Sequence, residues 1–165
     1  MFFSPADFPR LLASVPGKPW REATLEAAPG SLTDEKVAAW VASGINRVSL
    51  GVQFFVEKEL RRTGRKHNAA IVERDVALLR AHGIGSISID LIAGLPGQTD
   101  AGWRESLDWV ACLDVPHVSV YMLEVDEDSR LGREMMLGGV RYGAGDVPGD
   151  ADIVRYYEEA VSFLH

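Results

Sequence analysis

The sequence has very little cysteine and no long hydrophobic run. Its single cysteine, Cys112, excludes an internal disulfide, a cysteine-rich zinc site and an iron–sulfur cluster held by several thiolates of these 165 residues. No segment approaches the roughly 20 consecutive apolar residues of a membrane helix, and the first residues lack the basic and apolar regions of a signal peptide. We therefore expect a cytoplasmic protein that does not insert into a membrane.

Positive charge is also scarce, because 17 Lys and Arg stand against 24 Asp and Glu, for a net charge of −7. This balance argues against binding along a phosphate backbone, so we expect no nucleic-acid partner. The charge is unevenly distributed. Residues 1–83 carry 12 basic and 9 acidic side chains, whereas residues 84–165 carry 5 and 15. The basic cluster at 58–66 and the acidic cluster at 124–128 are each typical of a solvated surface.

Strand-like and helical patterns alternate along the chain. Short β-rich runs occupy residues 23–27, 47–53, 86–92 and 117–123. Helical spacing predicts helices over about residues 33–44, 69–82, 99–113 and 152–164, and Ser4 and Pro5 are typical of the start of a first helix. Residues 138–150, rich in glycine, predict a loop or linker. Cys112, between apolar neighbours, is expected to be buried. The alternation indicates βα units and a parallel sheet, an α/β fold.

The four predicted strands have one aliphatic and one polar face. A fully covered parallel strand is apolar on both faces, so a polar face requires an explanation. One explanation is an antiparallel sheet with one face exposed to solvent, although a helix between each pair of strands disfavours this arrangement. The other explanation is a complete or partial barrel whose interior is a polar cavity. The polar face includes Ser49, Gly51, Ser88 and Ser119.

Candidate ligand-binding residues lie near the ends of these strands. Glu26, Gln53 and Asp90 fall near carboxyl ends, where barrel and open α/β enzymes keep their sites. Arg65 could offer a bidentate fork to a ligand carboxylate or be an ordinary surface arginine. The turn at 93–99, AGLPGQT, could cradle an anion at a helix N-terminus, and a plain tight connection is at least as good an interpretation.

Several segments together resemble one known family. They are LEAAPGSLT (25–33), GINRVSLGVQFF (44–55), TGRKHNAA (63–70), ISIDLIAGLPGQT (87–99) and HVSVYMLEVDEDS (117–129). In order and spacing they resemble the radical S-adenosylmethionine (SAM) family of oxygen-independent coproporphyrinogen III oxidases, above all its haem chaperone branch. The resemblance implies a partial (βα)6 barrel that holds SAM beside a [4Fe–4S] cluster, with haem or a porphyrin as partner of the full-length protein. It places Glu26, Gln53, Arg65 and Asp90 at positions that contact SAM.

The family's three-cysteine motif and GGGTP segment precede the part that is matched here. The resemblance therefore implies an incomplete barrel, about strands three to six, in residues 1–137, with a linker and the start of a C-terminal region in 138–165. We expect this chain to be inactive without the cluster segment. The resemblance does not distinguish a haem chaperone from an oxidase as the full-length protein. A non-catalytic binding or interaction fragment, or a different βα enzyme, remains an alternative. We also expect self-association through the open edge at the strand 23–27.

Overall fold

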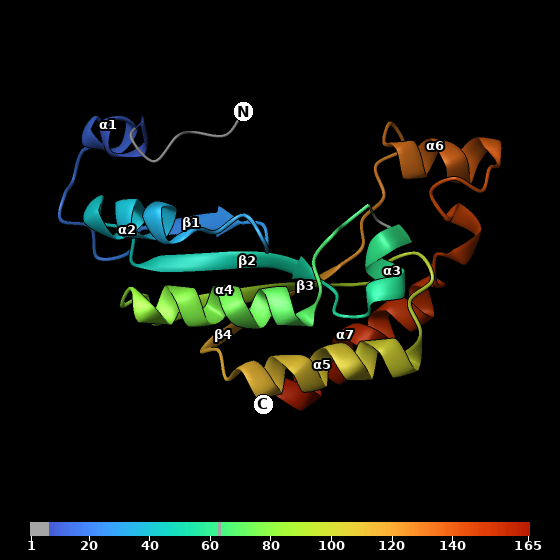
Figure 1. The fold of residues 1–165 in the computed structure, drawn as a ribbon. Coiled ribbons are helices and arrows are strands. Elements are labelled where there is room, and N and C mark those ends of the chain that lie inside the picture. Colours follow the sequence, from blue (N-terminus) through green and yellow to red (C-terminus); the bar gives the residue numbers. More distant parts are fainter. Residues whose placement is uncertain (1–6, 63) are drawn as a thin grey trace.

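Four parallel strands form one sheet whose spatial order follows the chain (Figure 1). The computed structural model describes residues 7–62 and 64–165. Each neighbouring pair is parallel, which rules out the antiparallel alternative and confirms the α/β prediction. The strands are β1 (Thr24–Ala27), β2 (Arg47–Gln53), β3 (Ser86–Ala93) and β4 (His117–Met122).

Five helices lie where helical spacing predicts them, and two further helices do not. The five are α1 (Asp7–Ala13), α2 (Asp34–Ala42), α4 (Ala69–Ala81), α5 (Asp100–Leu113) and α7 (Asp150–Leu164). The unexpected ones are α3 (Glu57–Arg62) and α6 (Arg130–Leu137), and a short 3-10 turn, η1 (Ala144–Asp146), falls in the predicted linker. The predicted start at Ser4 and Pro5 lies outside the described residues.

Local side-chain caps explain where four of the helices begin. The residue before each helix is extended, and its side-chain oxygen accepts a hydrogen bond from the backbone N–H three residues later. Such a bond satisfies one of the N–H groups that the first helical turn leaves unpaired. The capping residues are Thr33, Asn68, Thr99 and Ser129.

The core lies between the aliphatic face of the sheet and the helices. Neighbouring helices contact one another in the order α1, α2, α4, α5 and α7. The predicted aliphatic positions of the two central strands have no exposed surface, which confirms the two-faced interpretation. They are Val48, Leu50, Val52, Ile87, Ile89 and Leu91. The opposite face carries the polar side chains, of which Ser49 and Ser88 are buried and Asp90 is half-buried.

The C-terminal helix packs on this same helical layer. α7 contacts β3, β4 and α5, and the Asp146 carbonyl before it accepts a hydrogen bond of 2.7 Å from Gly97 N–H. The boundary that the sequence places at residue 138 stays a prediction. Within residues 7–62 and 64–165, no helix is both long and apolar enough to cross a membrane.

Candidate functional site

The polar face joins the candidate carboxylates of β1 and β3 through a serine of β2. Glu26 is in register with Ser49. The Ser49 hydroxyl donates to the Asp90 carboxylate, with distances of 2.8 Å to Oδ1 and 2.9 Å to Oδ2. Asp90 is in turn in register with Ser119 of β4. A continuous polar row thus crosses the sheet, and Asp90 is oriented within it.

Glu26 differs from Asp90 because its carboxylate has no internal partner. Its side chain is exposed, and no hydrogen bond or ion pair joins it to another residue of the described part of the chain. A carboxylate in this position is available to a ligand that carries ammonium or hydroxyl groups.

Gln53 and Arg65 meet at Gly51, near the carboxyl end of β2. The strand register shifts after Leu50, and Gln53 has a left-handed backbone with a φ of 69°. Its amide Nε2 lies 3.0 Å from the place a Cβ on Gly51 would occupy. Arg65 Nη1 donates a 2.9 Å hydrogen bond to the Gly51 carbonyl. Glycine at position 51 therefore lets the Gln53 amide lie over the polar face.

The charge of Arg65 shapes the environment of the neighbouring His67. Burial lowers the pKa of the Arg65 guanidinium, which nevertheless stays charged at neutral pH. Burial, and then the charge of Arg65, lower the pKa of His67, so this imidazole is neutral at neutral pH. His67 Nε2 lies 3.0 Å from the Val52 carbonyl. The pair ties the segment after α3 to the end of β2.

A buried aspartate positions the turn after β1. Asp75 of α4 has no exposed surface, and its Oδ2 accepts a 2.6 Å hydrogen bond from Gly30 N–H. Arg74 supplies its counter-charge at 2.8 Å. A cavity of about 320 Å³ lies between this turn and the segment that carries Arg65. The sequence analysis missed Asp75, because a single acid within a helical pattern signals nothing by itself.

The loop after β3 is closed by its own glutamine and by the C-terminal segment. Gln98 is buried, accepts a hydrogen bond from Gly94 N–H and donates one to the Ile92 carbonyl at 3.2 Å. Gly94 has a φ of 99°, and a Cβ there would lie 2.8 Å from Ile153 of α7. The loop is thus a tight connection, and anion binding at the start of α5 stays a prediction.

Substitution of Gly94 by alanine is expected to lower the free energy of unfolding by about 2–4 kcal/mol, because both the backbone and the contact with Ile153 are strained. Gly83→Ala is a matched control, since Gly83 has a φ of 81° and open space around it. Its cost should be only about 1–2 kcal/mol. Equal losses of the two variants in urea unfolding would show that the Ile153 contact costs nothing.

Glu134 of α6 holds the glycine-rich segment that follows it. Its carboxylate accepts hydrogen bonds from Tyr142 N–H at 2.8 and 2.9 Å and from Ala144 N–H at 3.2 Å. Burial alone would raise the pKa of this carboxyl, but the backbone N–H groups of residues 141–144 outweigh burial and lower the pKa. The predicted linker is therefore tied to α6 rather than loose.

Cys112 is exposed, which corrects the expectation of a buried thiol. The buried side of α5 carries Trp103, Leu107 and Val110, and Cys112 lies off that face, beside Arg80 in a groove against α4. Because α5 runs back from the carboxyl end of β3, Cys112 lies at the opposite end of the sheet from Glu26. In the part of the chain that the structure describes, no group of three or more His, Cys, Asp or Glu could hold a metal ion. The described residues therefore lack the set of thiolate ligands that a [4Fe–4S] cluster requires.

Comparison with known proteins gives a consistent result. The heme chaperone HemW of Haemophilus influenzae is 39% identical over 108 residues, 66% of this chain and 28% of that protein. HemW of Lactococcus lactis is 36% identical over 135 residues, 82% of this chain and 35% of that protein. The mouse mitochondrial radical S-adenosyl methionine domain-containing protein 1 is 35% identical over 71% of this chain and 26% of its own length. The chain spans about a third or less of these relatives.

The fold also matches solved structures. The Escherichia coli coproporphyrinogen III oxidase HemN, a radical SAM enzyme, superposes with a TM-score of 0.82 over 98% of this chain and 37% of that protein, at 24% identity. The sheet is thus a partial radical SAM barrel, as predicted. The model of the radical SAM superfamily matches residues 3–110. From its sequence and its fold, this chain belongs to the radical SAM superfamily.

Proposed function

We propose that this chain is the SAM-binding part of a haem-pathway radical SAM protein, and that it binds SAM at the carboxyl ends of its strands. The observation that carries the proposal is the polar row on the sheet, in which Asp90 is held by Ser49 and the Glu26 carboxylate has no partner among residues 7–62 and 64–165. The names of the heme chaperone relatives favour haem as the further ligand of the whole protein.

The chemistry of the donor set fits SAM. SAM carries an ammonium group, a sulfonium, a carboxylate and a ribose diol. Glu26 and Asp90 would accept hydrogen bonds from the ammonium or ribose hydroxyls, and Arg65 would donate to the carboxylate. The Gln53 amide can do either. Burial of Arg65 strengthens such a contact because water competes less with it.

Catalysis needs groups that these residues do not supply. When a [4Fe–4S] cluster is bound, it supplies the electron for reductive cleavage of SAM, and Cys112 alone cannot hold one. We therefore propose binding without turnover for this chain. A cytoplasmic location stays our prediction, and the mouse relative is named mitochondrial.

Titration calorimetry with SAM tests the proposal. Glu26→Gln and Asp90→Asn are each expected to weaken binding roughly ten- to hundred-fold, the loss of one charge-assisted hydrogen bond. Glu73→Gln, an exposed carboxylate of α4, is the matched control and should leave the affinity unchanged. Unaltered affinity in both site variants would remove this face from the binding site.

The second candidate is a non-catalytic interaction fragment. The observation that favours it is that, among the described strands, β1 and β4 each pair on one side alone. Absence of SAM binding by the unaltered chain, together with stable folding, would favour this candidate.

A further inference from the structure

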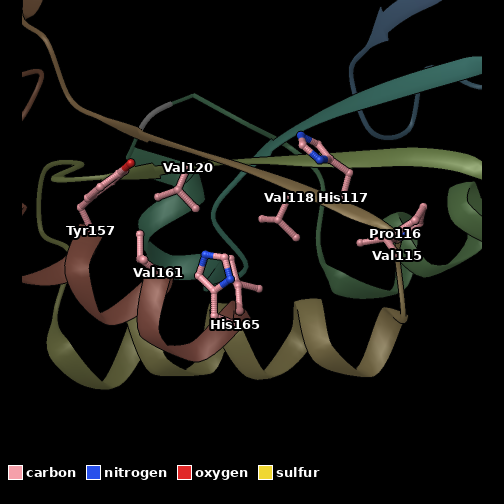
Figure 2. Close-up of a pocket in the computed structure, with 9 residues that line it drawn as sticks. Val115, Pro116, His117, Val118, Val120, Tyr157, Val161 and His165 are labelled. Atoms are coloured by element: carbon pink, nitrogen blue, oxygen red, sulfur yellow. The ribbon is translucent and has the colours of Figure 1, made fainter. Parts of the chain in front are cut away.

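A groove runs between β4 and α7, lined by valines of both elements together with His117, Tyr157 and His165 (Figure 2). In this view Val118 and Val120 point from β4 toward α7, where Val161 faces them. The groove has a volume of about 450 Å³. It lies apart from the polar row that carries Glu26 and Asp90.

Three α7 residues that line this groove belong to a longer stripe of exposed apolar side chains along the helix. Val154, Tyr157, Val161 and Leu164 follow one another at intervals of three, four and three residues, and they are 45, 37, 40 and 39% exposed. This is the seam spacing of packed helices. We call these four residues the α7 stripe.

The β4 edge beside the α7 stripe is unpaired within the described residues. Leu123 N–H donates to Ala93 of β3 at 2.8 Å, so by alternation the amides of Val120 and Met122 point away from β3. Natural edge strands are protected by charged side chains or prolines, and His117–Met122 contains neither Lys, Arg, Asp, Glu nor Pro. The edge is thus open to another strand.

The opposite edge of the same sheet offers a complementary surface. The Ala23 carbonyl accepts from Arg47 N–H at 3.2 Å, so by alternation the amides of Thr24 and Glu26 point away from β2. Leu11 of α1, 46% exposed, and Val15 just after α1, 43% exposed, lie on the segment that leads into β1. In the part of the chain that the structure describes, this end of the molecule therefore presents both an unpaired strand edge and exposed apolar side chains.

We propose that a second copy of this chain docks its β1 edge on the β4 edge, with its α1 segment against the α7 stripe. The strands of the two copies remain parallel across this contact. A two-fold axis parallel to the strands then creates a second, identical contact between the β4 edge of the second copy and the β1 edge of the first. Two four-stranded sheets joined at both seams give the number of parallel strands, about eight, at which a barrel closes. The polar faces of the two copies then line one lumen.

Charge favours this contact over a symmetric one between two β4 edges. The segment from α1 to β1, residues 7–27, carries three basic and three acidic side chains, whereas α7 carries one basic and four acidic side chains. A β4 to β1 seam therefore places the acidic α7 against a neutral segment, whereas a β4 to β4 contact would bring two acidic α7 helices together. The proposal does not depend on SAM binding.

Analytical ultracentrifugation of the whole chain over a wide range of concentration tests the dimer. The unaltered chain is expected to reach a limiting dimer. Val161→Glu, in the α7 stripe, should weaken dimerisation by roughly a hundred-fold or more, since it buries an unpaired charge. Ser162→Glu adds the same charge one residue away and off the stripe, and it should leave the dimer unchanged. A monomer throughout, a limitless polymer, or equal effects of the two variants would overturn the proposal.

A variant of the other edge distinguishes the two modes of pairing. Thr24→Pro removes an amide that points away from β2, and Thr24→Val keeps it as a control. Thr24→Pro alone should be monomeric. Mixing it with Val161→Glu should restore association, because the unaltered β4 edge of Thr24→Pro can still pair with the unaltered β1 edge of Val161→Glu. Dimerisation of Thr24→Pro by itself would show a symmetric β4 contact and overturn the proposal. If circular dichroism shows that Thr24→Pro is unfolded, the comparison of Val161→Glu with Ser162→Glu alone tests the proposed dimer.

Discussion

Anaerobic reconstitution of this chain with iron and sulfide is expected to give no stoichiometric [4Fe–4S] cluster and no 5′-deoxyadenosine from SAM. Cluster binding requires several thiolates on one site, and Cys112 is the sole cysteine. It lies on α5, far along the helix from the carboxyl ends of the strands. Iron and sulfide analysis, with chromatographic detection of the nucleoside, measures both outcomes.

Cys112→Ser is the control for this experiment. An exposed thiol binds some iron adventitiously, and that signal should disappear in the variant. A cluster at full occupancy in both proteins would refute the expectation, because its ligands would then be residues other than cysteine. SAM binding can be measured separately, so its loss and the loss of cleavage are distinguishable.

Trp103→Ala is expected to lower the free energy of unfolding by about 3–5 kcal/mol, the range for a large buried aromatic. Trp103 has no exposed surface, its ring lies 5.9 Å from that of Tyr156, and its Nε1–H donates to the Tyr156 carbonyl at 2.9 Å. It thereby joins α5 to α7. Thermal unfolding should show a Tm lower by roughly 10 °C.

Trp103→Phe separates packing from hydrogen bonding in this contact. Phenylalanine keeps an aromatic ring but leaves the Tyr156 carbonyl without its donor, so a smaller loss of about 1–3 kcal/mol is expected. Hydrogen exchange should localise that loss to α7. A change below about 1 kcal/mol for Trp103→Ala would mean that α7 contributes little to the stability of the sheet.

The strands and long helices could be predicted because their signals are local. Alternation fixes the two faces of β2 and β3, and a capping side chain marks the start of α2, α4 and α5. The short helix α3 carries no such signal, and the cap of α6, Ser129, was overlooked because it directly follows the acidic cluster at 124–128. α3 reads EKELRR, with Leu60 as its only apolar residue, and α6 depends on Glu134, which binds backbone that follows it in the chain.

The candidate site was predictable in part. Alternation placed Glu26 and Asp90 on one face, and the register of β1, β2 and β3 aligns them through Ser49. Arg65 was ambiguous because its contact with the Gly51 carbonyl is made across a loop. The left-handed backbone of Gln53 was missed because simple alternation does not reveal a register shift.

The strand order has a consequence for how the chain folds. Each strand pairs only with strands that neighbour it in sequence, in the order β1, β2, β3 and β4. Every pairing is therefore completed within one βα step, and the loop entropy of each step stays small. A sheet of this kind grows by adding units at its ends, in contrast to sheets whose central strands come from distant parts of the chain. Removing or adding a terminal unit leaves every interior pairing intact.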